Sequence, residues 1–372
     1  MIYFDTAATS FYKPEIVKKS VIYAMNELTA NPGRSGHAPS FRAGEMVFDT
    51  REKVKEFFNA DNFDVIFTKN CTEALNLAIF GSVKSGDHII TTCYEHNSVL
   101  RPVFHLQELG VECTILDCDM KDLAKEIERA IKPNTKLIVV TATSNVTGEV
   151  SDYSAIGEVA KRHGVRLLVD GAQSSGHLKF DLKKSNIDMY AFAGHKGLLA
   201  ITGVGGLIVK QGINLNPILF GGTGTDSINL HQPTDSIEGY EAGTIPTIPI
   251  ASLGAGIDFL NKNFKEIEKI EAFLTKKMYF SLKNLDFIKL YSTENSQNVF
   301  SFNVLDYDSS LVADILNEEY EICVRPGLHC APLIHKKLGT LNTGAVRVSL
   351  DHTNNEREID YLISALKKIV KV

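Results

Sequence analysis

Apolar runs of strand length alternate with stretches of helical periodicity from about residue 14 to residue 250. Val65–Thr68 and His88–Thr92 are each followed by apolar positions at helical spacing, near Thr72 and over 97–110. Strands that alternate with helices form parallel sheets with both faces covered, so the pattern predicts a mostly parallel α/β sheet. The same part of the chain is expected to hold further strands at 113–116, 136–141, 166–170 and 189–193, and helices at 120–131 and 154–163.

The pattern changes after Pro249. The next 35 positions, 250–284, have the periodicity of one long helix. A mixture of strands and helices follows, which predicts a smaller α+β domain: strands at 299–304, 322–325 and 344–350, and helices at 310–319 and 356–370. We expect a large domain over 13–250 and a small domain over 1–12 plus 251–372.

Composition narrows the class of protein. The chain has 372 residues, of which 44% are hydrophobic and 23% charged, as in an ordinary globular enzyme with an ample core. A net charge of −6 without a Lys/Arg-rich block argues against a nucleic-acid surface. The start of the chain has no signal-peptide pattern, and no apolar run approaches the ~20 residues of a membrane span. The six cysteines lack metal-like spacing. We expect a cytoplasmic enzyme with free thiols and no membrane partner.

Lys196 and Asp170 are the most informative pair of polar residues. Asp170 ends the apolar run 166–169, and Lys196 follows the run 189–193. Both side chains are therefore expected at neighbouring strand ends, where open α/β sheets bind ligands. A lysine that forms a Schiff base and an acid that keeps a ring nitrogen protonated are what pyridoxal phosphate (PLP) requires of a protein. The pair predicts a PLP site, although either residue alone would favour an ordinary surface lysine or strand-end aspartate.

A strand-to-helix junction at Cys71 and Thr72 suits a phosphate. Unpaired backbone N–H groups and the helix dipole favour an anion there, and the Thr72 hydroxyl adds a donor. The alternative is a plain helix cap with Thr72 as the capping hydroxyl.

Four more polar residues fall beside predicted strand ends. His96 follows the strand 88–92, and its imidazole is a candidate to lie on a cofactor ring and shuttle protons, with an ordinary loop histidine as the alternative. Asn145 ends a further strand and is a candidate to contact a ring oxygen or the substrate. Gln173 lies shortly after Asp170, and His195 directly precedes Lys196. Both are candidates to reach the ring oxygen and the phosphate.

The C-terminal domain contributes a cysteine and an arginine. Cys330 lies in a Gly- and Pro-containing loop, 325–332, where a mobile thiol near cationic groups is a candidate nucleophile. Arg347 is a charge inside an apolar strand and needs a partner there. A substrate carboxylate is one bidentate partner, and a structural salt bridge is the alternative.

These motifs, in this order, resemble the class V branch of fold-type I PLP enzymes, and within it the cysteine desulfurase/selenocysteine lyase group. The resemblance covers nearly the whole chain. It is carried by Tyr3–Ala8, Asn31–His37, Cys71–Glu73, Glu95–Asn97, Ser144–Gly148, Val169–Ser174, Gly194–Lys196, Glu241–Thr244, Arg325–Pro332 and Ala345–Ser349. The His-Cys-Ala sequence in the loop is the most specific of these segments.

The resemblance implies a role for each candidate. Lys196 would bind PLP covalently and move protons, Asp170 would keep the pyridine nitrogen protonated, and Cys330 would attack the substrate sulfur or selenium. That reaction leaves alanine and a persulfide on the enzyme. The remaining assignments are cofactor contacts by His96, Gln173, Asn145, Cys71, Thr72 and His195, and substrate contacts by Arg347, Asn145, Arg34 and His37.

The resemblance also implies a homodimer in which Thr244 of one subunit contacts the PLP phosphate of the other. The substrate implied for the protein is an amino acid, either cysteine or selenocysteine. The implied protein partner is a sulfur acceptor. Two features depart from the pattern of the group. The stretch 197–205 after Lys196 is mostly apolar, where the group is usually rich in glycine and polar residues. Ala193 stands where the group usually has a serine that donates to the phosphate, so one phosphate contact is lost.

Three other functions remain open from the sequence. A selenocysteine lyase is the nearest. A class V aminotransferase-like enzyme on another amino acid, with Cys330 incidental, would release a keto acid and no sulfide. A protein that keeps the fold but only docks a sulfur carrier would lack the cofactor bound at Lys196.

Overall fold

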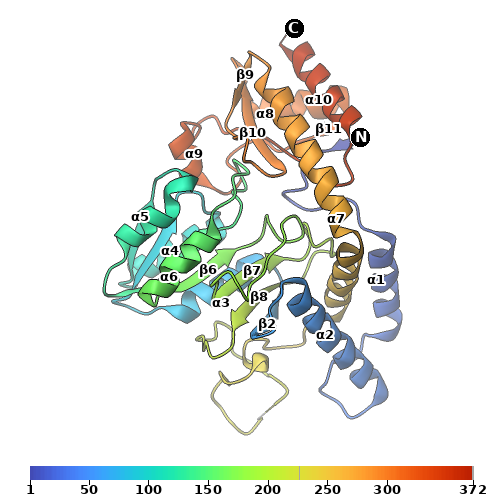
Figure 1. Ribbon diagram of the computed structural model, residues 1–372. Coiled ribbons are helices and arrows are strands. Elements are labelled where there is room, and N and C mark those ends of the chain that lie inside the picture. The colour runs from blue at the N-terminus through green and yellow to red at the C-terminus, as the bar shows by residue number, and fades with distance from the viewer. Residues whose placement is uncertain (226, 371–372) are drawn as a thin grey trace.

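A computed structural model describes residues 1–225 and 227–370, and a seven-stranded sheet forms its centre (Figure 1). The strand order is β2-β8-β7-β6-β5-β3-β4. Strands β3 to β7 pair in parallel, whereas β8 is antiparallel to both of its neighbours. The mostly parallel sheet confirms the predicted fold class. The strands are β2 (Phe63–Thr68), β3 (His88–Thr92), β4 (Glu112–Leu116), β5 (Thr135–Thr141), β6 (Arg166–Asp170), β7 (Met189–Ala193) and β8 (Gly205–Lys210).

Helices cover both faces of this sheet. Successive strand residues alternate between two apolar clusters, so that Leu167 and Val169 enter one cluster while Leu168 enters the other. The side of Leu168 is covered by α3 (Cys71–Ser82) and α4 (Asn97–Glu108). The opposite side is covered by α5 (Leu123–Ala130), which follows the 3-10 turn η1 (Met120–Asp122), by α6 (Tyr153–His163), and by parts of α2 (Ala38–Phe57) and α7 (Thr247–Lys283).

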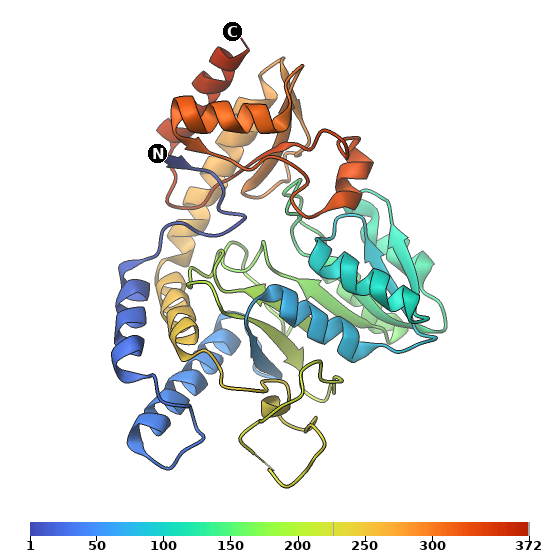
Figure 2. The same ribbon diagram turned by 180° about the vertical axis from the view of Figure 1, so that it is seen from behind.

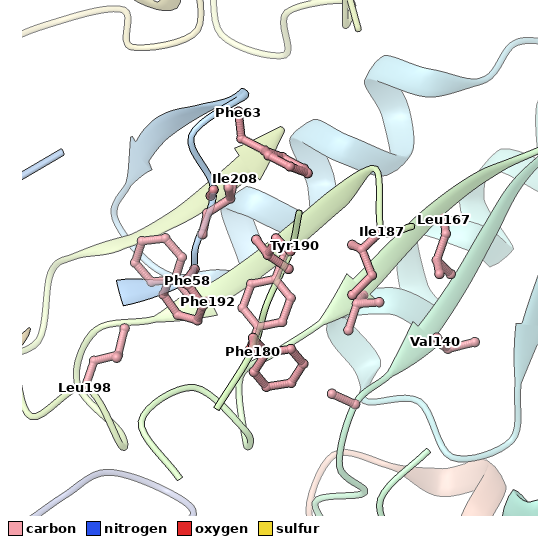
Figure 3. Close-up of a cluster of buried hydrophobic side chains, with 14 of the residues drawn as sticks. Phe58, Phe63, Val140, Leu167, Phe180, Ile187, Tyr190, Phe192, Leu198 and Ile208 are labelled. Carbon is pink, nitrogen blue, oxygen red and sulfur yellow. The ribbon is translucent and has the colours of Figure 1, made fainter. Parts of the chain in front are cut away.

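Aromatic rings fill the centre of the apolar cluster that contains Leu167 and Val169 (Figure 3). Tyr190 packs between Phe58 and Phe180, with ring centroids 5.1 and 4.8 Å away. All three side chains are at most 2% exposed. Because burying an aromatic side chain contributes several kcal/mol at roughly 25 cal/mol per Å², this group anchors β7, the strand that leads to Lys196.

The long helix α7 connects the two parts of the molecule (Figure 1). Its N-terminal half packs against α1 (Glu15–Glu27) and α2, and its C-terminal half lies beside a three-stranded sheet of order β12-β10-β9. The small part consists of β9 (Ile288–Leu290), β10 (Val299–Val304), α8 (Ser309–Tyr320), β11 (Ile322–Cys323), α9 (Pro332–Leu338), β12 (Val346–Ser349) and α10 (Glu356–Ile369).

The N-terminus lies against the C-terminal part of the chain (Figure 2). Strand β1 (Ile2–Tyr3) pairs in parallel with β11, and Phe4 is fully buried in the small hydrophobic core. Asp5 then forms a bridge with Ser349 of β12, and the residues after it reach the large domain, where the Ser10 N–H donates to the His195 carbonyl at 3.1 Å. The domain boundary near residue 250 stays an interpretation, because α7 runs through it without a break.

Several elements were absent from the sequence prediction, among them β9 and α9 of the small part. In the large domain, helices α1 and α2 precede the first strand of the sheet, and β8 follows Lys196 with two glycines before its apolar run. A Cβ on Gly206 would lie 2.5 Å from the Phe192 ring, so glycine is needed for β8 to pass that ring. In the described part of the chain, no helix is both long and apolar enough to cross a membrane.

Candidate active site

A cavity of about 220 Å³ lies at the carboxyl ends of β5, β6 and β7, between the large sheet and the C-terminal domain. It is where an open α/β sheet is expected to bind a ligand. Eight of the residues nominated from the sequence line it, namely Cys71, Thr72, His96, Asn145, Asp170, Gln173, His195 and Lys196, and Arg347 lines it from the small domain.

Asp170 and Lys196 form the electrostatic centre of the cavity. Asp170 is 4% exposed, and its Oδ1 accepts hydrogen bonds from the Ala172 backbone N–H at 2.9 Å and the Cys71 thiol at 3.6 Å. Burial raises the pKa of Asp170, and Lys196 opposes that rise. Burial likewise lowers the pKa of the Lys196 amine, while Asp170 favours its charged form. A buried acid and a buried amine therefore face one cavity, and each favours the charged form of the other.

The N-terminus of α3 opens onto the same cavity. Asn70 caps this helix, since its side-chain oxygen accepts from the Glu73 N–H at 3.0 Å. The alternative role of Thr72 as the helix cap is therefore wrong. The Thr72 hydroxyl instead lies 2.8 Å from the Ser98 hydroxyl, which in turn lies 2.8 Å from His96 Nδ1.

His96 has a defined tautomer. Its Nδ1 accepts a hydrogen bond from the Ser98 backbone N–H at 3.0 Å, so the proton of the neutral ring is on Nε2. Burial and the nearby Lys196 lower the pKa of His96 to about 4, which keeps the ring neutral near pH 7. Sequence reasoning missed Ser98, whose signal was its position at the start of the helix that follows His96.

Residues of the N-terminal segment form hydrogen bonds with His195 and Gln173, the neighbours of Lys196 and Asp170 in the sequence. His195 Nδ1 lies 3.1 Å from the Thr9 hydroxyl, and Gln173 Nε2 donates to the Ala7 carbonyl at 3.1 Å. Burial and the charge of Lys196 lower the pKa of His195 to about 4. Ala193 also lines the cavity and supplies no donor there.

Arg347 is 1% exposed and only partly paired. Its guanidinium donates to Asp5 Oδ1 at 2.8 Å and to the Asn145 carbonyl at 3.2 Å, while its Nε has no hydrogen-bond partner within the described part of the chain. The Asn145 Oδ1 is likewise unpartnered there. A salt bridge is thus present, and a buried donor and a buried acceptor remain for a ligand with both an anionic and a cationic group.

The loop that carries Cys330 closes one side of the cavity. His329 lines the cavity, and the Cys330 residue beside it is exposed. The side chain of Asn145 donates to the His329 carbonyl at 2.7 Å. The thiol-bearing loop is therefore tied directly to a residue of the cavity, although the two residues are 184 positions apart.

The family model for class V aminotransferases matches residues 2–362. The chain belongs to the class V aminotransferase family. A probable cysteine desulfurase of Methanothermobacter thermautotrophicus is 34% identical over 99% of this chain and 94% of its own length. A second probable cysteine desulfurase, from Pyrococcus abyssi, is 35% identical over 100% of this chain and 94% of its own.

Solved structures of the class V aminotransferase fold agree with these matches. The apo structure of a cysteine desulfurase from Thermococcus onnurineus NA1 has a TM-score of 0.93 and 34% identity, covering 100% of this chain and 94% of that one. The cysteine desulfurase CsdA of Escherichia coli has a TM-score of 0.87 and 26% identity, covering 99% and 94%. The family and fold expected from the sequence are thereby confirmed.

The donor set of this class V site fits a phosphorylated pyridine cofactor. The amine of Lys196 suits a covalent link, and the buried Asp170 carboxylate suits a protonated ring nitrogen. The N-terminus of the 12-residue helix α3, with Thr72 beside it, suits a phosphate. Cys330 lies next to a lining residue without lining the cavity itself, and three further nominated residues do not line it within one chain. Thr244 is exposed, Arg34 donates to the Gly243 carbonyl at 2.7 Å, and His37 caps α2.

One buried acid was not nominated from the sequence. Glu95 is fully buried, and its Oε1 accepts from the Thr92 hydroxyl at 2.7 Å and the Thr141 backbone N–H at 3.1 Å. Burial raises its pKa to about 8, and the nearby charge of Asp170 contributes. Its place before His96 at a strand end was the available signal, but only the packing shows that the carboxyl is buried.

Proposed function

We propose that this protein is a PLP-dependent cysteine desulfurase, which converts L-cysteine to L-alanine and leaves the sulfur as a persulfide on Cys330. The observation that carries the proposal is the loop of Cys330, an exposed thiol held by Asn145 at a cavity that also contains Lys196, Asp170 and Arg347. Full-length similarity to relatives named cysteine desulfurase supports it.

The cofactor would be held by residues that already line the cavity. Lys196 would bind it and move protons at Nζ, Asp170 would keep the ring nitrogen protonated, and Thr72, Cys71 and His195 would surround the phosphate. His96 would lie against the ring, with Gln173 and Asn145 in contact with it. When bound, PLP supplies an electron sink that makes the α-proton and the C–S bond of an amino acid labile.

Substrate binding would use the unpaired groups. Arg347 would bind the carboxylate of the amino acid through its unpartnered Nε, next to the guanidinium nitrogen that now contacts Asp5. Asn145 would contribute its side-chain amide. Burial makes this pairing strong, because the fixed charge of Arg347 has little water to compete with a bound anion.

Sulfur transfer would be a substitution at the sulfur atom of the substrate. The Cys330 thiolate attacks that sulfur, the S–S bond forms as the substrate C–S bond breaks, and the bonding electron pair stays with the carbon. Protonation of that carbon gives the methyl group of alanine. No external oxidant is needed, because the carbon is reduced as the sulfur is oxidised to the persulfide level.

The exposed position of Cys330 would let an acceptor protein collect the sulfur. A reducing compartment such as the cytoplasm belongs to the proposal, since Cys330 must remain a free thiol between cycles.

A second copy of the chain would complete the site. Thr244 is exposed outside the cavity, and large apolar side chains are exposed on α1 and α2, which is typical of a surface that another subunit covers. They are Ile16, Ile22, Tyr23, Met25, Phe41 and Phe48. We propose a homodimer in which Thr244 reaches the phosphate of the partner subunit and Arg34 and His37 approach the substrate across the same boundary.

The decisive experiment combines mass spectrometry with a matched pair of cysteine variants. After treatment of the wild-type holoenzyme with cysteine, we expect one added sulfur on Cys330. Cys330→Ala should keep the visible absorbance of the bound cofactor and still bind cysteine, yet release almost no sulfide in the presence of a thiol reductant. Cys323→Ala, which removes a partly buried thiol of β11, should desulfurate cysteine normally.

Two outcomes would overturn the proposal. Sulfur on Cys71 or Cys323 but not on Cys330, with full turnover in Cys330→Ala, would remove the nucleophile assignment. Release of a keto acid without sulfide would indicate an aminotransferase. Residual selenide release from selenocysteine by Cys330→Ala would contradict nothing, because selenium is a better leaving group and needs less help from the thiol.

A further inference from the structure

The backbone of the Cys330 loop adopts an unusual conformation. His329 and Cys330 are consecutive non-glycine residues with positive φ, at +51° and +56°. Such residues rarely adopt the left-handed region, and two in succession require support from the surrounding structure. That support comes from three places outside the two residues.

Both carbonyls of the strained pair accept hydrogen bonds from the large domain. The Asn97 backbone N–H donates to the Cys330 carbonyl at 2.7 Å, and the Asn145 side chain donates to the His329 carbonyl at 2.7 Å. Asn97 is the first residue of α4, so its N–H has no partner within its own helix and is free for the loop. The donors thus belong to elements that also form the cavity.

A chain of two histidines fixes the ring of His329 from the other side. His329 Nε2 lies 3.0 Å from the Arg325 carbonyl, His329 Nδ1 lies 3.3 Å from His335 Nε2, and His335 Nδ1 lies 2.8 Å from the Thr340 hydroxyl. A carbonyl only accepts, so His329 carries its proton on Nε2. His335 Nε2–H then donates to His329, and the Thr340 hydroxyl donates to His335.

Both rings are neutral and fully engaged. Burial lowers the pKa of His329 to about 3 and that of His335 to about 4, with Arg347 adding to the effect at His329. Each ring nitrogen of the pair has a hydrogen-bond partner. His329 therefore has no free nitrogen to act as a base toward Cys330, and the chain serves to hold the loop.

We propose that Asn97 and His335 are positioning residues for sulfur transfer: the backbone N–H of Asn97 and the ring of His335 dock the left-handed turn that presents Cys330 to the substrate. Neither residue lines the cavity in which the substrate would bind. Asn145 holds the same loop, because one N–H of its side-chain amide donates to the His329 carbonyl. The second N–H is left for the substrate carboxylate. The inference rests on the proposed function in that it takes Cys330 as the nucleophile.

Asn97 offers a test that leaves every side chain of the cavity in place. Asn97→Pro replaces the N–H that the loop needs by a ring carbon, which both removes the donor and crowds the Cys330 carbonyl, and it also removes the Asn97 side chain. Proline is favoured at the first position of a helix, and the preceding His96 has ψ of 157°, as proline requires. Asn97→Ala is the matched control, since it removes the same side chain and keeps the N–H.

We expect the docked loop of the holoenzyme to open about fivefold more often in Asn97→Pro than in Asn97→Ala, as befits the loss of one hydrogen bond. Hydrogen exchange of the peptide over 325–332 measures this directly, because the Ala331 amide is bonded to the Leu328 carbonyl within the loop. The kcat for cysteine should fall severalfold in Asn97→Pro, with KM and the visible absorbance of the bound cofactor unchanged.

His335 gives an independent pair. His335→Leu removes the donor to His329 and should behave like Asn97→Pro, whereas His335→Gln restores an N–H at a similar position and should retain both slow exchange and kcat. Equal exchange and equal kcat in the two Asn97 variants would overturn the inference. If the wild-type enzyme forms no alanine from cysteine and releases no sulfide in the presence of a thiol reductant, the proposed function fails, and a fivefold exchange difference would still establish the docking of the loop.

Discussion

Glu95→Gln should stabilise this protein, and the gain should grow with pH. The Glu95 carboxyl is fully buried, with Oε1 accepting from Thr92 and Thr141 and Oε2 unpartnered within the described residues. Glutamine has nearly the same shape as the protonated acid, and its carbonyl accepts the same two hydrogen bonds. The substitution therefore removes the titration of this group and little else.

The magnitude follows from the raised pKa. Burial raises the pKa of Glu95 from 4.5 to about 8, so the folded protein takes up a proton that the unfolded chain has already lost above pH 4.5. This uptake lowers stability as pH rises, until the folded group itself ionises near pH 8. At about 1.4 kcal/mol for each pH unit above 4.5, the penalty reaches about 3 kcal/mol at pH 7 as an upper limit.

Urea unfolding of wild type and Glu95→Gln at pH 5, 6, 7 and 8 measures the difference in the free energy of unfolding. We expect the difference to be below about 1 kcal/mol at pH 5 and to approach about 3 kcal/mol at pH 7. Glu318→Gln, at an exposed position on α8, is the control and should give a difference that does not vary with pH. A flat difference for Glu95→Gln would mean that Glu95 is ionised in the folded protein, and the reasoning would be refuted.

Two further predictions concern the site and the assembly. Arg347→Lys should raise KM for cysteine by about 30-fold and leave the absorbance of the bound cofactor unchanged. This factor corresponds to about 2 kcal/mol for the loss of a charge-assisted bidentate pair. An unchanged KM in steady-state kinetics would make Arg347 purely structural. Sedimentation should give twice the chain mass of 41.0 kDa, and Thr244→Ala should weaken PLP binding in a titration of the apoprotein; an active monomer would contradict the homodimer.

Hydrophobic periodicity was sufficient to predict most of the elements that position the site. Strands β3 and β10 occupy the ranges expected for them, and α7 begins three residues earlier than expected because Pro249 is tolerated in the first helical turn. The same logic located Asp170 and Lys196, since parallel strands end at one edge of their sheet. These inferences succeed because each depends on the spacing of residues within one element.

Other features depend on packing between distant segments, which spacing along the chain does not encode. The two glycines at the start of β8 belong to a strand because β2 and β7 offer hydrogen bonds on both sides and the Phe192 ring leaves no room for a side chain at Gly206. The pKa of Glu95 is raised only because the sheet and its helices bury the carboxyl.

The division is clearest around Cys330. The sequence by itself determined which thiol stands in a Gly- and Pro-containing loop and which family has such a loop. Only the tertiary structure decided that Asn97, Asn145 and His335 hold that loop in a left-handed turn. The physical reason is that a strained backbone is maintained by hydrogen bonds from whatever the fold places beside it, and those donors lie on other elements of the chain.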